Sequence, residues 1–303
     1  MLAGLSLDAL RTLDAIDRGG SFAAAATELH RVPSAVSYTV SRLERDLGVT
    51  IFDRSGHRAR LTAAGRLLLE EGRRILVAGD ELAAAARRLA EGWEPTLRIA
   101  VDGLIDSARL WPLLADFTAA HPRVDVRLLD EVLGGTAEAL VDGRADLAMG
   151  LSERPAAGIS TRPIGDVDFV FAAAPHHPIA AEPAPLTAAA VRRHRAIAVA
   201  DSSRRSTPLT TGLLDAQPRL TVDSMAAKID AQRRGLGIGF LPRHRVRHLL
   251  DSGELLALDL AEPRPPSRLH LAWRTEAGGK ALAWFLDRLR RPAELAALLA
   301  SAD

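Results

Sequence analysis

Residues 21–48, which read SFAAAATELHRVPSAVSYTVSRLERDLG, decide the fold of the N-terminal region. Ser21 can cap a helix whose apolar residues recur every three or four positions. Pro33 suits the first position of the next helix, because proline lacks the amide hydrogen that a helix start leaves unpaired. Gly48 favours the end of that helix. With one more helix expected before Gly19-Gly20, the sequence predicts three short helices, the last two joined by a tight turn, as in a helix-turn-helix unit.

A small sheet and a long helix are expected next. Residues 49–61 have the pattern of a two-stranded wing with its turn at Ser55-Gly56. Thr62 can cap a helix that continues to about Leu89. This helix carries an apolar residue at every seventh position, which predicts a coiled-coil contact with a second copy of the chain, unless the stripe packs on its own domain. The residues expected at the contact are Leu68, Ile75, Leu82 and Leu89.

From Thr96 onward, after a break at residues 92–95, short apolar runs alternate with helical segments. Such alternation predicts a mostly parallel α/β sheet, in one domain or in two smaller lobes. Strands are expected at residues 97–101, 124–129, 145–150, 169–174, 196–200, 219–222, 237–241 and 269–273. Helices are expected at residues 109–120, 136–142, 186–194, 224–235, 242–250 and 280–291.

Composition excludes several classes of protein. Of 303 residues, 48% are hydrophobic and 25% are charged, close to a globular average, so a disordered chain is excluded. The chain has no cysteine, which excludes disulfides and thiolate metal sites. The N-terminus lacks a basic start, and no uncharged apolar run of about 18 residues occurs, so we expect neither a signal peptide nor a membrane span. These features predict a cytoplasmic protein without membrane contact.

Motifs of reactive sites are absent from the sequence. It contains no Gly-x-Ser-x-Gly and no His-Glu-x-x-His. His176-His177 has no carboxylate at ligand spacing and reads as a surface loop. We therefore expect no enzymatic activity, no metal and no cofactor.

The predicted third helix has an apolar face, with Val36, Val40 and Leu43, and a polar face. Small hydroxyl side chains near its start let the backbone approach DNA phosphates. A tyrosine and an arginine four residues apart are long enough to reach base edges. Basic side chains on the wing can meet phosphates or enter the minor groove, and the alternative is an ordinary solvated three-helix bundle. The candidate DNA-binding residues are Arg31, Pro33, Ser34, Ser37, Tyr38, Arg42, Arg54, His57 and Arg58.

Five segments occur in a telling order: FAAAA (22–26), SAVS (34–37), LERDLG (43–48), IFDR (51–54) and LTAAG (61–65). Their order and spacing resemble those of the LysR-type transcriptional regulators. The resemblance continues in RLWPLLADFTAAHP (109–122), RADLA (144–148) and GLGIGFLP (235–242), and so covers about residues 5–292.

This resemblance implies an N-terminal all-α winged helix-turn-helix with a linker helix, and a C-terminal α/β two-lobed domain like periplasmic binding proteins. The expected bounds are residues 1–61 for the DNA-binding domain, 62–92 for the linker helix and 96–303 for the effector-binding domain, with lobe I at about 96–162 and 268–303 and lobe II at about 163–267. The implied function is transcriptional regulation, modulated by a small-molecule effector bound between the lobes. The implied partners are double-stranded promoter DNA, the effector, further copies of the chain in dimers and tetramers, and RNA polymerase. A solute-binding protein is the alternative, although the helix-turn-helix unit does not suit it.

Pro33 departs from the family pattern. The family often has glutamine at this position, and that glutamine can contact a base. Proline has no hydrogen to donate, so Pro33 sets the helix start and touches a thymine methyl group or nothing. Base discrimination is then expected to shift toward Tyr38, Arg42 and Arg31.

A ligand site is expected beyond the carboxyl ends of the strands, where ligands bind in open α/β sheets. The family's effector cleft corresponds to the same loops. Asp102 and Asp223 there would repel a carboxylate, which favours a small, weakly charged and largely apolar effector. The alternative is that these acids, like Ser202 and Ser224, cap neighbouring helices or turns. The candidate effector-binding residues are Asp102, Gly103, Leu104, Ile105, Ser202, Ser203, Asp223 and Ser224.

Overall fold

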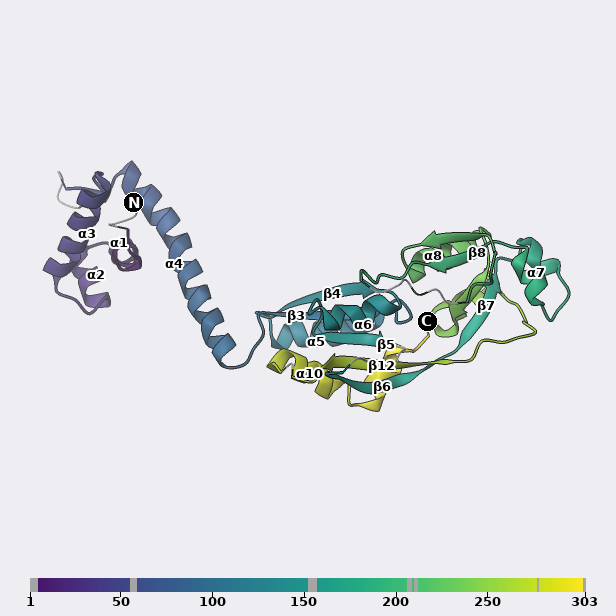
Figure 1. The fold of residues 1–303 in the computed structure, drawn as a ribbon. Coiled ribbons are helices and arrows are strands. Elements are labelled where there is room, and N and C mark those ends of the chain that lie inside the picture. The colour runs from purple at the N-terminus through teal and green to yellow at the C-terminus, as the bar shows by residue number, and fades with distance from the viewer. Residues whose placement is uncertain are drawn as a thin grey trace. The chain divides into compact units, whose positions relative to one another are not determined.

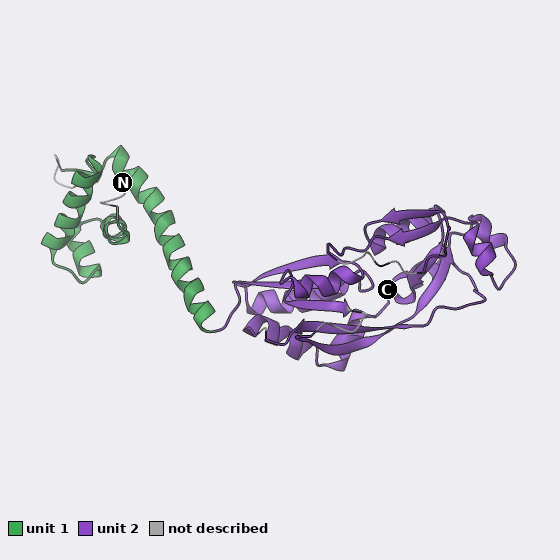
Figure 2. Cartoon of the chain, in the orientation of Figure 1, with its two compact units in different colours: residues 1–91 green, residues 92–303 purple. Residues whose placement is uncertain are grey.

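The computed structural model describes residues 5–54, 59–151, 157–205, 209, 212–276 and 278–301. The chain divides into two compact units, Met1–Glu91 and Gly92–Asp303 (Figure 2). Each unit has a hydrophobic core of its own. The first unit is helical with one small sheet, and the second alternates strands and helices (Figure 1).

The three predicted short helices open the first unit: α1 (Leu7–Gly19), α2 (Phe22–Glu28) and α3 (Pro33–Leu47). The Ser21 side chain caps α2 by accepting a hydrogen bond from the Ala24 amide. Gly48 ends α3 with a φ of 68°, in the left-handed region that glycine adopts without steric cost. Because Val36 and Val40 of α3 are almost fully buried, the helix has a fixed inner face.

The predicted wing is present as an antiparallel pair, β1 (Phe52–Asp53) and β2 (Arg60–Leu61). The carboxylate of Glu44 in α3 accepts hydrogen bonds from the amides of Ile51 (2.8 Å) and Phe52 (3.1 Å). A side chain of α3 therefore fixes the first wing strand against the helices.

The predicted long helix is α4 (Ala63–Ala90). Thr62 caps it, because its hydroxyl oxygen accepts a hydrogen bond from the Gly65 amide at 3.0 Å. α4 approaches α1 closely: a Cβ added at Gly72 would lie 2.8 Å from Cδ2 of Leu10. The first half of α4 is thus packed on the helix-turn-helix. In the described part of the chain, neither α4 nor any other helix has the length and apolarity to cross a membrane.

Lobe I of the second unit is built on a five-stranded sheet in the order β4-β3-β5-β12-β6. β3 is parallel to β4 and β5, whereas β12 is antiparallel to β5 and β6. The strands are β3 (Thr96–Asp102), β4 (Asp125–Glu131), β5 (Leu147–Leu151), β6 (Ile159–Val167) and β12 (Ser267–Arg274). The helices are η1 (Ser107–Leu110), α5 (Trp111–Ala120), α6 (Gly134–Val141), α10 (Lys280–Arg288) and α11 (Pro292–Leu298).

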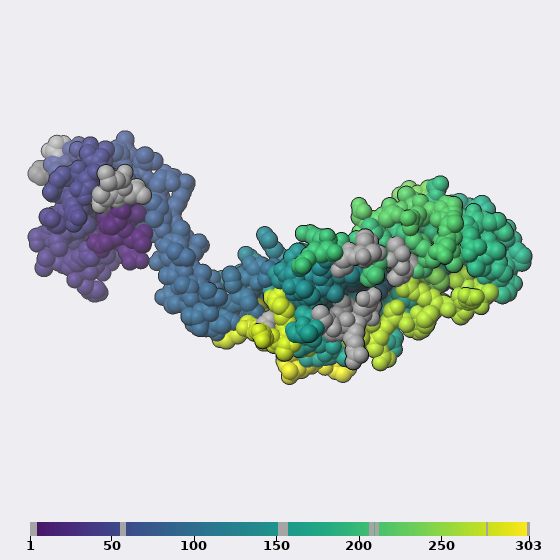
Figure 3. Space-filling model, in the orientation of Figure 1, coloured from purple at the N-terminus to yellow at the C-terminus, as the bar shows by residue number. Residues whose placement is uncertain are grey.

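Helices cover both faces of this sheet. Successive residues of a strand point to opposite faces, and in β3 both faces carry apolar side chains. Ile99 of β3 packs in one core with Phe117 of α5 and Phe285 of α10. Ala100, the next residue, belongs to the opposite core with Leu140 of α6. Helix α10, near the end of the chain, therefore packs against β3, the first strand of the second unit. Figure 3 shows yellow C-terminal surface next to teal surface of this unit.

Lobe II contains two small sheets joined by a bridge between Ala196 and Ile238. One has the antiparallel order β10-β7-β11, and in the other β8 and β9 are parallel. The strands are β7 (Phe169–Ala173), β8 (Ala196–Val199), β9 (Arg219–Val222), β10 (Gly239–Pro242) and β11 (Leu256–Ala257). The helices are η2 (Pro178–Ala181), α7 (Ala188–Arg192), α8 (Met225–Arg233) and α9 (Arg243–Asp251).

The α/β character and the two lobes are as predicted, but the expected mostly parallel sheet is wrong. Antiparallel pairs outnumber parallel ones among the described strands of the second unit, because β12 pairs with β5 and β6, and β7 pairs with β10 and β11. The sequence did not predict β6, since Pro163 and Gly165 interrupt it. β6 lies at the edge of its sheet, where a strand tolerates proline. β11 and α11 were also not predicted.

Candidate DNA-binding face and effector cavity

The outer face of α3 carries the side chains predicted to reach DNA. Tyr38 is 62% exposed, and Arg42 projects into solvent one turn further along the helix. Pro33 and Ser34 are exposed at the helix start, and Ser37 is half-buried. Nε of Arg42 lies 3.5 Å from Asp46, an exposed pair that contributes little to stability. Arg42 can therefore exchange this carboxylate for another partner at small cost.

Two other predicted DNA-binding arginines are engaged within the first unit. The Arg31 guanidinium donates two hydrogen bonds to the carboxylate of Asp8, at 3.0 and 2.7 Å, and these bonds lower the pKa of Asp8. The Arg54 guanidinium lies 5.4 Å from the centre of the Phe22 ring. Arg31 thus joins the turn before α3 to α1, Arg54 joins the end of β1 to α2, and their contact with DNA stays a prediction. His57, Arg58 and the predicted Ser55-Gly56 turn lie outside the described residues.

The heptad stripe of α4 divides into two parts. Leu68 is half-buried against the core of the first unit. Ile75, Leu82 and Leu89 are 44%, 72% and 63% exposed. Only the beginning of the stripe therefore packs on its own domain, and the rest presents apolar side chains to solvent.

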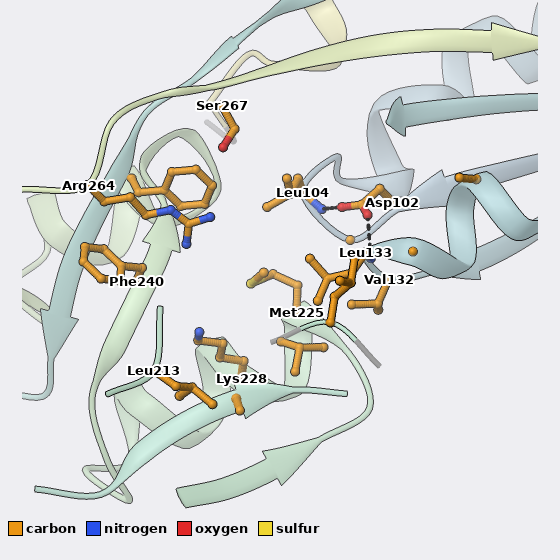
Figure 4. A pocket seen from close by; sticks show the side chains of 17 residues that line it. Asp102, Leu104, Val132, Leu133, Leu213, Met225, Lys228, Phe240, Arg264 and Ser267 are labelled. Carbon is orange, nitrogen blue, oxygen red and sulfur yellow. Dashed lines mark hydrogen bonds between the residues drawn. The ribbon is translucent and has the colours of Figure 1, made fainter. Parts of the chain in front are cut away.

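A cavity of about 310 Å³ lies between the strand ends of lobe I and the sheets of lobe II (Figure 4). Of the eight predicted effector-binding residues, Asp102, Gly103 and Leu104 line it. The other lining residues are Val132, Leu133, Gly134, Ala137, Phe169, Ala198, Val199, Leu209, Leu213, Met225, Lys228, Phe240, Arg264 and Ser267.

Asp102 sits at the lobe I end of the cavity with its oxygens already engaged. It is 6% exposed and accepts hydrogen bonds from the amides of Leu104 (2.9 Å) and Leu133 (3.0 Å) and from the hydroxyl of Thr136 (3.3 Å). Burial outweighs these bonds and raises the pKa of Asp102 to about 7. Its carboxyl group therefore holds two loops together at the cavity wall, without capping a helix as the alternative drawn from the sequence expected.

Ser202 and Ser203 lie outside the cavity lining, in the segment after β8. The Ser202 oxygen accepts a hydrogen bond from the Val132 amide at 2.9 Å, and its hydroxyl donates to the Glu131 carboxylate. The Ser203 hydroxyl donates to Asp201 at 2.7 Å, within its own loop. Ser202 therefore joins lobe II to the end of β4 in lobe I.

The remaining predicted residues also lie outside the cavity lining. Ser224 caps α8 by accepting a hydrogen bond from the Ala227 amide at 3.2 Å. Asp223 is exposed, and Ile105 is buried in the lobe I core. Asp223 thus contributes no charge to the cavity wall.

Residues of α9 make a second contact between the two lobes. Nε2 of His244 donates to the Leu104 carbonyl oxygen at 3.0 Å, and the Arg245 guanidinium donates to the Gly103 carbonyl oxygen. The loop that carries Asp102 is therefore joined to lobe II through α9, and Ser202 joins the two lobes at a second place.

Sequence reasoning missed the cations of the cavity, Lys228 and Arg264. Lys228 of α8 is 8% exposed, and burial together with the nearby charge of Arg264 lowers its pKa to about 8. The Arg264 guanidinium carbon lies 3.9 Å from the centre of the Phe169 ring and 5.6 Å from that of Phe240. One signal was present: Lys228 is one of only two lysines in an arginine-rich chain. The described residues contain no cluster of side chains suited to hold a metal ion.

Comparisons with known proteins match both units. The family of bacterial regulatory helix-turn-helix proteins, lysR family, matches residues 7–66, and the LysR substrate binding domain matches residues 90–293. The probable transcriptional regulator YhaJ of Escherichia coli is 43% identical, over 94% of this chain and 96% of YhaJ.

Solved structures are similar over nearly the whole chain. A probable transcriptional regulator from Pseudomonas aeruginosa, PA0477, is 25% identical with a TM-score of 0.60, over 95% of this chain and 98% of that one. Full-length LysG of Corynebacterium glutamicum with bound effector Arg is 25% identical with a TM-score of 0.51, over 96% and 98% of the two chains. The chain belongs to the LysR family of DNA-binding transcriptional regulators, with an N-terminal helix-turn-helix and a C-terminal substrate-binding domain.

Proposed function

We propose that this regulator binds promoter DNA through α3 and the wing, and that a small molecule in the cavity between the lobes changes this binding. The observation that carries the proposal is the cavity itself, which lobe I and lobe II line together. The bound effector in the related LysG supports a ligand-responsive role for this part of the chain. The experiment below tests both halves of the proposal.

Tyr38 and Arg42 are the residues that we expect to read bases. Both project from the outer face of α3, opposite the buried Val36 and Val40. An arginine in the major groove pairs with a guanine edge through two hydrogen bonds. The neighbouring Ser34 then approaches a phosphate at the helix start, where backbone amides point outward.

We propose that two copies of the chain associate to form the unit that binds DNA. The exposed Ile75, Leu82 and Leu89 of α4 supply an apolar seam for a second copy, and burial of such a seam is the main driving force of a coiled-coil contact. Two symmetric reading heads require a pseudo-palindromic operator. We further propose, from the family, that pairs of dimers form tetramers and that the assembly contacts RNA polymerase.

An effector acts in this scheme by favouring one arrangement of the two lobes. A ligand shifts an equilibrium only through different affinities for its two states. In the arrangement of the structure both lobes wall the cavity, and Ser202 and His244 join the lobes by hydrogen bonds. A ligand that touches both walls binds this arrangement more tightly than an open one.

The test is titration of the full-length protein against a labelled fragment of DNA upstream of its own gene, with a scrambled fragment as control. We expect tight binding to the upstream fragment alone, and a change of affinity when a metabolite pool is added. Equal binding to both fragments would refute the sequence-specific role. Unchanged affinity after addition of every pool component would refute the ligand response.

A further inference from the structure

Two positive side chains of the cavity have no negative partner. Among the residues that the structure describes, none forms a hydrogen bond or an ion pair with the side-chain ammonium of Lys228 or the guanidinium of Arg264. Two arginines elsewhere in the second unit, by contrast, have acidic partners: Arg268 binds Asp166 at 2.8 Å and Arg288 binds Glu294 at 2.7 Å. Burying a charge without a partner costs free energy, so a site that holds the buried Lys228 and the half-buried Arg264 without an acidic partner is suited to a ligand of opposite charge.

The lysine end of the site contains a further unsatisfied polar group. A Cβ added at Gly239 would lie 3.4 Å from Nζ of Lys228 and 2.9 Å from Nε2 of Gln232. Gln232 is completely buried, and neither atom of its amide has a hydrogen-bond partner in the described part of the chain. Lys228 and Gln232, one turn apart on α8, therefore converge over the glycine backbone of β10.

Two aromatic rings lie next to the arginine. The Arg264 guanidinium carbon lies over the Phe169 ring, 3.9 Å from its centre, and 5.6 Å from the centre of the Phe240 ring. A guanidinium stacked by its face can still donate from its edge to both oxygens of a carboxylate. Figure 4 shows Arg264 and Lys228 directed into the same space from different elements of lobe II.

The opposite wall of the cavity is apolar. Leu104, Val132 and Leu133 of lobe I line it, and Met225 extends this surface from α8. Asp102 is the acid on this side, and its oxygens are occupied by Leu104, Leu133 and Thr136. The cavity is thus cationic toward lobe II and apolar toward lobe I.

We propose that Lys228 and Arg264 form the anion-recognition end of the effector site, and that the effector is a small organic acid with one carboxylate and an apolar body. This inference rests on the proposed function, because it names the chemical class of the effector. It replaces the weakly charged effector expected from Asp102 and Asp223. The cavity volume of about 310 Å³ lies at the lower end of the ~300–1,000 Å³ typical of ligand pockets, which limits the body to a small ring or short chain.

The experiment measures binding of matched acids and amides to the full-length protein by calorimetry and thermal shift. The probes are benzoate, phenylacetate and hexanoate, each beside its own neutral amide, at pH 7. The cavity variants are Lys228→Met and Arg264→Gln. The matched controls are Lys280→Met, which removes the other, exposed lysine, and Arg268→Gln, which removes an exposed arginine on β12.

At least one acid is expected to bind tenfold or more tightly than its amide. Each cavity variant should weaken that acid at least tenfold, and each control should leave it within twofold. Circular dichroism checks that each variant is folded, and the half-exposed position of Arg264 makes Arg264→Gln the safer of the two. Equal affinity for every acid and its amide, no binding of any acid at 50 mM, or wild-type affinity in both folded cavity variants would each overturn the proposal.

DNA binding, measured in parallel, separates this inference from the proposed function. If an acid binds through Lys228 and Arg264 but leaves the operator affinity unchanged, the anion site holds and the ligand response fails. If a neutral compound changes the operator affinity while acids show no preference over amides, the ligand response holds and the anion site fails.

Discussion

The hydroxyl of Ser202 donates to the carboxylate of Glu131, and through this hydrogen bond the loop after β8 in lobe II is attached to the end of β4 in lobe I. The same oxygen accepts from the Val132 amide at 2.9 Å. One small side chain therefore satisfies two groups of the facing lobe. Removal of the Ser202 hydroxyl tests how firmly the two lobes are joined.

Replacing Ser202 with alanine leaves a buried carboxylate oxygen and an amide without their partner. We expect a loss of about 1–3 kcal/mol in the free energy of unfolding, together with faster hydrogen exchange around residues 131–134. Urea unfolding and exchange mass spectrometry of the full-length protein measure both. Ser203→Ala is the matched control, because within the described residues the Ser203 hydroxyl bonds to Asp201 of its own loop and not to lobe I. Equal effects of the two substitutions would contradict a special role of Ser202.

Arg42 is predicted to discriminate between bases. Arg42→Ala should weaken operator binding by about 1–3 kcal/mol and leave binding to random DNA less affected, because a base contact contributes only on the correct sequence. Fluorescence anisotropy with both DNA fragments measures the difference. Arg74→Ala on α4, which removes an equally exposed arginine, serves as control. If Arg42→Ala weakens both fragments alike, Arg42 contacts only phosphate.

The exposed end of the heptad stripe is predicted to hold the dimer together. Aspartate at both Ile75 and Leu82 would place charges in an apolar seam, where each unpaired charge costs several kcal/mol, so the dimer should dissociate. Sedimentation velocity measures the assembly. Val77→Asp introduces the same charge at a similarly exposed apolar residue off the seven-residue repeat. Unchanged assembly of the double variant would place the contact elsewhere.

Asp102 predicts a dependence of stability on pH. Its pKa is about 7 in the folded chain, above the ordinary 3.8, so the folded state binds more protons than the unfolded state between these values. Stability should therefore fall as the pH rises from about 4 to 7, by at most about 4 kcal/mol from this group. Urea unfolding across this window measures the slope. Asp102→Asn loses hydrogen bonds and is less stable, but its slope should be flatter, and an unchanged slope would contradict the assignment.

Lys228 predicts a dependence of acid binding on pH. Its pKa is about 8 in the free protein, below the ordinary 10.5, so the ammonium group loses its proton in mildly alkaline solution. The affinity for a bound acid such as phenylacetate should fall above pH 8, by up to tenfold per pH unit. Calorimetry between pH 7 and 9.5 measures this decline. Lys280→Met should retain the decline and Lys228→Met should lack it, since no lysine then titrates at the site.

Local signals made the first unit predictable. Ser21, Thr62 and Gly48 act on helix ends within three residues of themselves, so their roles can be read from the sequence. β6 could not be predicted, because its stability comes from pairing along β12, about a hundred residues later. The order of the strands could not be predicted, because the sequence does not specify which strands pair.

The candidate site was predicted in part for the same reason. The 102–104 loop was found because it follows a strand with a clear apolar pattern. The atoms that occupy Asp102 belong to Leu133 and Thr136, more than thirty residues away, so its hydrogen bonding could not be foreseen. Lys228 and Arg264 come from a helix and a proline-rich loop, and only the folded lobe brings them to one cavity.

The two walls of the cavity differ in what mutation can change. The lobe I wall depends on backbone amides that a buried carboxyl group holds in place, so most substitutions there damage the loops as well as the contact. At its cationic end, the lobe II wall consists of the ends of two side chains, Lys228 on α8 and Arg264 in the segment before β12. If these two side-chain ends bind the effector as proposed, their exchange should alter chemical selectivity while the supporting backbone stays intact. Ligand preference can therefore diverge rapidly in evolution on a conserved frame, and the same two positions offer an engineer a route to a sensor for a different molecule.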